Sequence, residues 1–326
     1  MSPDRAPDLV SARDARKPRR MSEPWKVISS HQTGLLRHDQ ALAAGLTASA
    51  LRWRSRPSGP WQLVLPAIYG MFTGELSPRQ LRRAALLHGG PSAQLTAATA
   101  ARLHGLRYAP AEAGVVDVLV DAHAPARSRG FVMITHTTRL PSPWWVEGLP
   151  VSPVDRAVVD ASRELVNLRD VRALLCESVQ RRRTTVARLE ECLSRGHSAG
   201  SALARRVLSD LHAGCGSAPE GEMRDLFMTS RVLREVEFNQ PVVQHGVLLG
   251  VPDAQVRRLR LAFECDSREH HEFGDDPELT MCRRAGFAAG GWLVVPFSPR
   301  RIRHDANGVL ADAEGAYLSR KQDLAQ

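Results

Sequence analysis

The sequence has 326 residues and a net charge of +9, and 43% of its residues are apolar. This length predicts two or three domains, and the apolar fraction is sufficient for packed cores. No apolar run approaches the roughly 20 residues that a membrane-spanning helix needs, which argues against a membrane partner. The five cysteines are odd in number and have no C-x-x-C spacing, so we expect reduced thiols and a cytoplasmic location.

The positive charge is concentrated in the first two thirds of the chain. Residues 1–215 carry a net charge of +12, whereas residues 216–326 carry −3. A basic region followed by an acidic region with metal-binding residue types favours a nucleic acid as the partner. The alternative is that the arginine content reflects a generally arginine-rich proteome and indicates no partner. Residues 1–26 lack the apolar segment of a secretory signal, so we expect a disordered extension, with Met21 as an alternative start.

Residues 27–75 have the pattern of a helix-turn-helix followed by two strands. We expect a helix from His38 to Ala44, a turn at Gly45 and Leu46, and a second helix over 48–54 with Thr47 as its N-cap. After a turn rich in proline, serine and glycine, residues 61–65 and 67–70 are expected to form the strands of a wing.

The second helix of this pair is the predicted DNA-binding element. Its outward residues are Ser49, Arg52, Trp53 and, at its end, Arg54. A helix fits the major groove, and arginine can donate hydrogen bonds to guanine or to phosphate. A helical hairpin with solvated arginines is the alternative.

The run LLRHDQALAAGLTASALRWRSRPSGPWQLVLPAIYGMF resembles the N-terminal winged-helix domain of AbiEi-type antitoxins from type IV toxin–antitoxin systems. The resemblance covers about residues 30–75. It implies that Arg52 and Arg54 bind operator DNA and that a cognate toxin is a partner.

Residues 76–211 are expected to form a mixed α+β connecting domain. Helices are predicted over 78–88, 93–104, 168–180 and 185–194, and strands over 115–120 and 131–136. The segment Gly148–Asp155, with the helix after it, resembles the segment that follows the winged helix in the same antitoxins. We find no catalytic pattern in this region, and the small residues of 212–218 predict a linker.

Residues 219–326 are expected to form a mixed sheet flanked by helices. The predicted order is a helix from Ser217 to about Arg231, a strand over 236–243, a glycine-containing hairpin over 245–250 and a strand near 259–263. A helix over 277–288, a buried strand over 292–296 and a helix over 307–318 follow. The whole chain is therefore predicted to be an α/β protein in the broad sense, with an α+β multidomain layout.

The stretch 250–271 carries the predicted site. Leu259, Leu261 and Phe263 alternate along a half-buried strand, which places Glu264 and Asp266 on its opposite face and turns Cys265 inward. Asp253 precedes Glu264 by one strand and a turn, so the two carboxylates should meet at the end of the sheet. Mg²⁺ is typically held by one or two carboxylates together with phosphate. Acids that only solubilise a strand end are the alternative.

This region resembles the PD-(D/E)xK nuclease fold, in a family grouped with the very-short-patch-repair (Vsr) endonucleases. The resemblance covers about residues 216–305, and it rests on Ser217, Glu220, Arg224, Asp253, Glu264, Asp266, His270 and Gly291-Trp292. It implies a restriction-endonuclease-like fold that cleaves DNA with Mg²⁺ or Mn²⁺.

The resemblance also implies roles for the site residues. Asp253 and Glu264 would hold the metal ion, with Glu220 as a further ligand unless it serves only in an N-terminal capping box. Asp266 stands where the usual motif carries lysine, and the resemblance implies that it would instead be a metal ligand. Arg268, His270 or His271 would then supply the positive charge or the proton transfer. The lost lysine leaves a second hypothesis, an antitoxin-like transcriptional repressor with a catalytically inactive nuclease fold.

Overall fold

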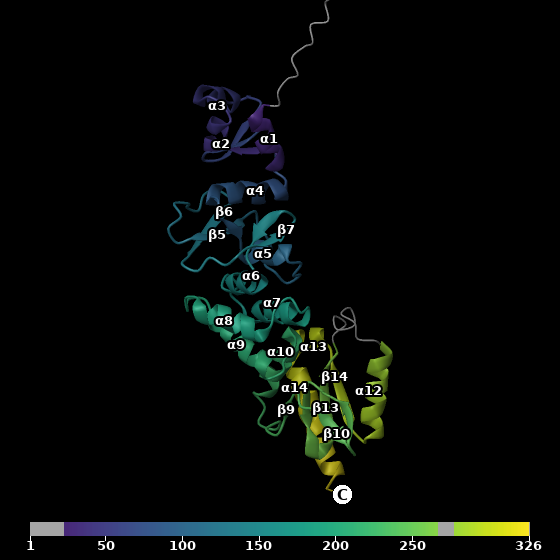
Figure 1. Ribbon diagram of the computed structural model, residues 1–326. Helices are drawn as coiled ribbons and strands as arrows, with labels where there is room; N and C mark the ends of the chain where they lie inside the picture. Colours follow the sequence, from purple (N-terminus) through teal and green to yellow (C-terminus); the bar gives the residue numbers. More distant parts are fainter. Residues whose placement is uncertain (1–22, 267–276, 326) are drawn as a thin grey trace, which may run out of the picture. The chain divides into compact units, whose positions relative to one another are not determined.

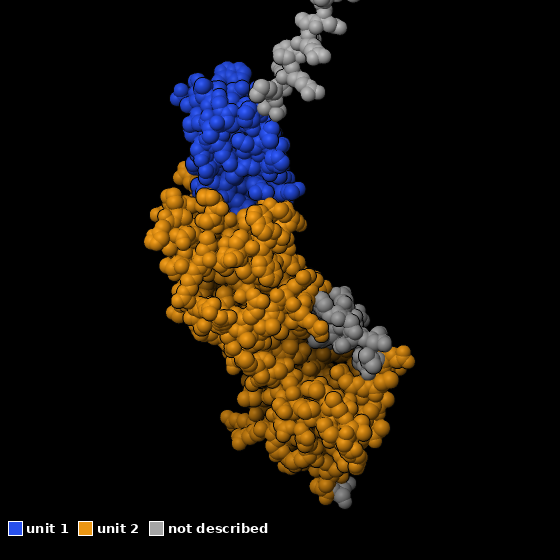
Figure 2. All heavy atoms as spheres, viewed as in Figure 1, with its two compact units in different colours: residues 1–88 blue, residues 89–326 orange. Residues whose placement is uncertain are grey.

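A computed structural model describes residues 23–266 and 277–325. The chain divides into two compact units, residues 1–88 and residues 89–326 (Figure 2). Both units combine helices with small sheets, so the architecture is mixed α+β, as predicted.

Unit 1 places three short helices beside a three-stranded antiparallel sheet of order β1-β3-β2 (Figure 1). Its elements are α1 (Pro24–His31), β1 (Leu35–Arg37), α2 (His38–Ala43), α3 (Ala48–Arg54), β2 (Gln62–Leu65), β3 (Ile68–Gly70) and α4 (Pro78–Gly89), which ends at the boundary with unit 2. The core of this unit is formed by Trp25, Leu36, Ala41, Leu51 and Trp61. The two predicted helices and both predicted wing strands are therefore present.

The N-terminal part of unit 2 is a five-stranded mixed sheet, of order β6-β5-β4-β8-β7, with helices packed around one apolar core. The strands are β4 (Gln94–Leu95), β5 (Val116–Asp121), β6 (Val132–Thr137), β7 (Trp144–Val146) and β8 (Leu149–Val151). The helices are α5 (Ala97–Leu103), α6 (Val154–Ser162), α7 (Leu168–Gln180), α8 (Val186–Arg195) and α9 (Ala202–His212). The predicted helix over 93–104 begins later, because Gln94 and Leu95 pair with β5 instead.

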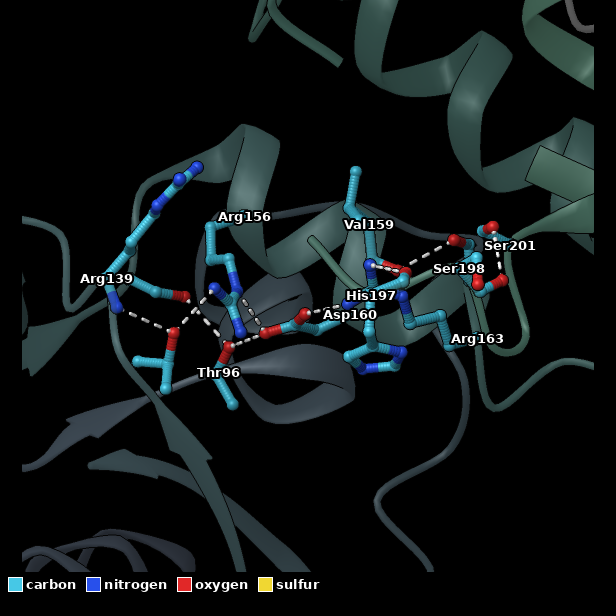
Figure 3. Close-up of polar contacts among 12 residues, drawn as sticks. Thr96, Arg139, Arg156, Val159, Asp160, Arg163, His197, Ser198 and Ser201 are labelled. Atoms are coloured by element: carbon cyan, nitrogen blue, oxygen red, sulfur yellow. Dashed lines mark hydrogen bonds and ion pairs between the residues drawn. The ribbon is translucent and has the colours of Figure 1, made fainter. Parts of the chain in front are cut away.

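A buried carboxylate ties α6 to the sheet (Figure 3). Asp160 is buried, and its carboxylate pairs with Arg156 at 2.6 Å and with Arg163 at 3.1 Å. Thr96, which follows β4, donates a hydrogen bond to the same carboxylate at 2.9 Å. Arg163 reaches on to the carbonyl of His197, between α8 and α9. The Asp160 carboxylate is thus held by three side chains of the protein itself, so the cluster supports the structure.

The C-terminal part of unit 2 contains a four-stranded sheet of order β14-β13-β12-β9 and a separate hairpin, β10–β11. The elements are α10 (Ala218–Phe227), β9 (Glu237–Phe238), β10 (Val242–Gln244), β11 (Val247–Gly250), β12 (Ala254–Val256), the 3-10 turn Arg257–Leu259, β13 (Leu261–Cys265), α12 (Pro277–Ala289), β14 (Leu293–Phe297), α13 (Pro299–His304) and α14 (Ala306–Asp323). The connection between α9 and α10 lies inside unit 2, and Cys215 within it is buried.

Both faces of the four-stranded sheet are covered by helices (Figure 1). Phe263 on β13 packs with Phe227 of α10 and Ala313 of α14 on one face. Ala262, the next residue back along the strand, packs with Phe287 of α12 on the other face. Alternate side chains of β13 therefore pack into two separate apolar cores, one on each face of the sheet.

Three sequence predictions for this region are wrong in detail. The strand predicted to be half-buried begins at Leu261, because Leu259 lies in the 3-10 turn, and all five residues of β13 are buried between two neighbouring strands and two helix layers. The strand predicted to be buried, β14, is a partly exposed edge strand. The predicted strand over 236–243 is split into β9 and β10, and Pro241, which has no N–H to donate, lies between them.

Candidate functional site

The α3 helix presents the side chains that the sequence predicted for DNA contact. Thr47 caps the helix by accepting a hydrogen bond from the backbone N–H of Ala50 at 3.1 Å. Ser49 and Arg52 are exposed, and Trp53 is 58% exposed, with the guanidinium of Arg56 stacked 4.1 Å above its ring. Arg52 makes no hydrogen bond or ion pair with the part of unit 1 that the structure describes, so its charge faces solvent.

Arg54 differs from this prediction. Its guanidinium lies 5.3 Å from the ring centre of Trp61 and 5.9 Å from that of Trp25, and it donates to the carbonyl of Ala50. The two rings contact each other edge to face. Arg54 is therefore half-buried against the aromatic core, and its position supports folding more directly than DNA contact.

Asp253 and Glu264 meet at the end of the C-terminal sheet. Ala254 on β12 pairs with Phe263 on β13, and one further step of this antiparallel register places Asp253 opposite Glu264. The backbone N–H of Cys265 donates to the Asp253 carboxylate at 2.7 Å, which fixes its orientation. Glu264 is only 5% exposed. The backbone of Asp253 therefore returns to the end of β13 that carries Glu264.

Two consecutive arginines of α12 lie against the acids of this strand end. Arg283 approaches the Glu264 carboxylate, with a nitrogen–oxygen distance of 3.4 Å. Arg284 donates to the Asp266 carboxylate at 3.0 Å. Glu264 and Asp266 thus share the α12 side of the sheet, as the strand period predicted. The sequence showed both arginines but did not indicate their partners.

Glu220 serves as a helix cap. The Oγ of Ser217 accepts a hydrogen bond from the backbone N–H of Glu220, and the Glu220 carboxylate accepts from the Ser217 hydroxyl and the Gly216 N–H, each at 2.7 Å. This is a variant of the capping box, with the carboxylate on Gly216 instead of the N-cap N–H. The capping interpretation of Glu220, which the sequence left open, accounts for these contacts.

The thiol of Cys265 has a raised pKa because it is buried near several carboxylates. Burial raises the pKa of Cys265 well above its usual range, and the negative charges of Asp253, Glu220, Glu222 and Asp266 raise it further.

A buried arginine holds α10, the helix with Glu220 in its first turn, against α7 and α9. Arg172 is 3% exposed and pairs with Asp210 at 2.6 Å and with Asp225 at 2.7 Å. A Cβ on Gly221 would lie 2.7 Å from its Nε, so the helix approaches this closely only with glycine at that position. Glycine inside a predicted helix was the one sequence signal of this close approach.

The carboxylate pair fits a hard divalent cation by donor chemistry, since Mg²⁺ takes oxygen ligands and usually keeps water or phosphate. Within residues 23–266 and 277–325, no group of three or more His, Cys, Asp or Glu side chains is arranged to hold a metal ion. Two carboxylates would therefore need water and phosphate to complete the ligand set. His270, with Arg268 and His271, lies outside the described residues.

Comparisons with known proteins give little further information. The chain matches no family model and no curated protein. Among solved structures it is similar to the RV2827C protein from Mycobacterium tuberculosis, with 18% identity over 56% of this chain and 75% of that chain and a TM-score of 0.38. A likeness at this level carries no argument about function. No helix in the described part of the chain is long and apolar enough to cross a membrane.

Proposed function

We propose that this is a DNA-binding protein whose C-terminal region hydrolyses DNA phosphodiester bonds with Mg²⁺ or Mn²⁺. The observation that carries the proposal is the register that sets Asp253 opposite Glu264 at the end of two paired strands. Carboxylates in this arrangement are the ligands that a hard cation on a phosphate substrate requires.

The chain's own residues have distinct parts in this proposal. Asp253 and Glu264 would hold the metal ion, which when bound polarises phosphate and lowers the pKa of a bound water. The N–H of Cys265 orients Asp253. Asp266 occupies the position of the usual lysine, so the positive charge near the phosphate comes from Arg283 and Arg284, with His270 as the proposed proton donor or acceptor.

Unit 1 would deliver this site to DNA. The order helix, turn, capped helix and hairpin is that of a winged helix-turn-helix, with α3 as the recognition helix. Residues 23–88 contain eight Lys or Arg and three Asp or Glu, so this unit is basic. Ser49, Arg52 and Trp53 form its proposed DNA-contact surface.

A second candidate function is favoured by the contacts that the acids already make. Glu264 and Asp266 pair with arginines, Asp253 accepts a backbone hydrogen bond, and Glu220 caps its helix. A site satisfied within the protein suits an antitoxin-like repressor that binds DNA and a cognate toxin without cutting.

Cleavage assays separate the two functions. Purified protein is incubated with plasmid and oligonucleotide substrates in Mg²⁺ or Mn²⁺, beside Asp253→Asn and Glu264→Gln. Both changes remove a charge with little change in volume, and Glu237→Gln, an exposed acid of β9, is the matched control. Cleavage by the wild type and the control alone supports the enzyme. If cleavage persists in both site variants, or if the wild type cleaves no substrate with either metal, the enzyme proposal is wrong and the repressor is favoured.

DNA binding is tested separately by titration at two salt concentrations. Arg52→Ala should weaken binding and lower the slope of log K against log salt by about one, because one phosphate or base contact is lost. Arg79→Ala removes the same charge from an exposed position on α4 and should have a smaller effect. Equal titrations for wild type and Arg52→Ala would remove α3 from the proposed interface.

A further inference from the structure

Arg283 has an unusual position for a surface arginine. The side chain of its partner, Glu264, is 7% exposed, whereas the side chain of Arg283 is 41% exposed. The guanidinium thus reaches from solvent onto a buried negative charge. A carboxylate taken out of water is costly unless a positive charge or hydrogen bonds compensate for it.

The backbone of β11 makes room for this reach. Gly250 has a φ of +155°, and a Cβ at this residue would lie 3.0 Å from Cδ of Arg283 and 3.1 Å from the ring of Phe287. The arginine side chain therefore passes directly over the glycine on its way to Glu264. Phe287 is completely buried and anchors α12 one turn further along the helix.

The neighbouring pair provides an internal comparison. Arg284 and Asp266 are 45% and 43% exposed, so water screens their 3.0 Å contact from both sides. Exposed pairs of this kind contribute little. Of the two arginines on α12, Arg283 is therefore the one whose charge is needed by its acid.

We propose that Arg283 is an exchangeable counter-ion: it neutralises Glu264 in the metal-free protein and gives way to a divalent cation, which frees its guanidinium for DNA phosphate. The proposal rests on the carboxylate site of the proposed function. Two positive charges cannot both sit against Glu264 at low energetic cost, so cation binding and the Arg283 contact exclude each other. Once released from Glu264, the guanidinium of Arg283 can bind phosphate at the site, where the usual lysine is missing.

The exchange predicts that removing Arg283 tightens cation binding. Mn²⁺ and Mg²⁺ affinities of the full chain are measured by calorimetry for wild type, Arg283→Gln, Arg284→Gln and Glu264→Gln. Because the competing contact is half-exposed, we expect a gain of about fivefold or less in Arg283→Gln. Arg284→Gln lowers the net charge equally and should change affinity less, and Glu264→Gln should abolish binding.

DNA titrations test the second half of the exchange. In the wild type, Mn²⁺ should strengthen oligonucleotide binding, and Arg283→Gln should lose most of that gain. Arg283→Lys, which keeps the charge, serves if the glutamine variant does not fold, and it should bind cation with an affinity close to that of the wild type.

The outcomes separate the two proposals. Equal or weaker cation binding in Arg283→Gln, with binding abolished by Glu264→Gln, overturns the exchange but keeps the carboxylate site. Cation binding that is absent in wild type and in both arginine variants overturns the carboxylate site, and the exchange with it. Tighter binding confined to Arg283→Gln supports both.

Discussion

Replacing Arg172 with methionine should loosen the attachment of α10 to its neighbouring helices. The substitution retains most of the side-chain volume but removes a buried charge that bridges α9 and α10. Breaking one partner of a buried ion pair typically costs about 3–5 kcal/mol. Asp210 keeps Arg224 at 3.5 Å and Asp225 keeps Arg206 at 2.9 Å. We therefore expect a smaller loss of about 2–4 kcal/mol in the free energy of unfolding.

Thermal unfolding and hydrogen exchange measure this loss. For a unit of this size, the loss corresponds to a fall in Tm of about 5–10 °C. Amides of residues 218–227 should exchange faster, because α10 loses its attachment to α7. Arg169→Met is the matched control, since Arg169 lies on the same helix and its 3.3 Å pair with Glu222 is partly exposed, so its loss should cost under about 1 kcal/mol. A fall in Tm for Arg172→Met no larger than that of the control would refute the reasoning.

Three further predictions follow from single contacts. Arg54→Ala should lower the stability of unit 1 by about 1 kcal/mol and change DNA affinity less than Arg52→Ala does, because Arg54 stacks on Trp25 and Trp61. Denaturant midpoints measure the loss of stability, and DNA titrations compare the two variants. A larger loss of DNA affinity in Arg54→Ala than in Arg52→Ala would return Arg54 to the proposed interface. Gly221→Ala should destabilise unit 2 despite the higher helix propensity of alanine, because its Cβ meets Arg172, and a higher Tm would contradict this. Burial lowers the pKa of His104 below 6.5. As the pH falls through 6.5, the unfolded chain therefore takes up a proton that the folded chain does not, and the folded state loses stability. His104→Gln should flatten the dependence of the urea midpoint on pH between 7.5 and 5.5, and an unchanged dependence would exclude this histidine as its source.

Local patterns carried much of the fold. Thr47, followed by a short run of helix-forming residues, marks the start of α3 because its hydroxyl satisfies an N–H that has no partner inside the helix. The spacing of Asp253 and Glu264 was informative for a similar reason, since a strand, a tight turn and a returning strand have nearly fixed lengths. Signals that depend on neighbours in the sequence were therefore reliable.

The short strands, and the burial of β13 between two helix layers, could not be predicted from local sequence patterns. β4 has two residues, and β7 and β8 have three each, so their pairing partners define them more than their own composition does. The burial of β13 follows from its central place between β12 and β14 and between two helix layers. No periodicity within the strand itself distinguishes this from a half-buried edge.

The sequence by itself determined the capped helix with Arg52 and Trp53 outward and the return of Asp253 to Glu264, because both depend on local geometry. Only the tertiary structure decided which partner each charged side chain takes. Arg54 lies on two tryptophans, Arg283 on Glu264 and Arg172 between two aspartates. These pairings join residues that are distant in the chain, and long arginine side chains can reach many partners, so packing of the whole unit selects among them.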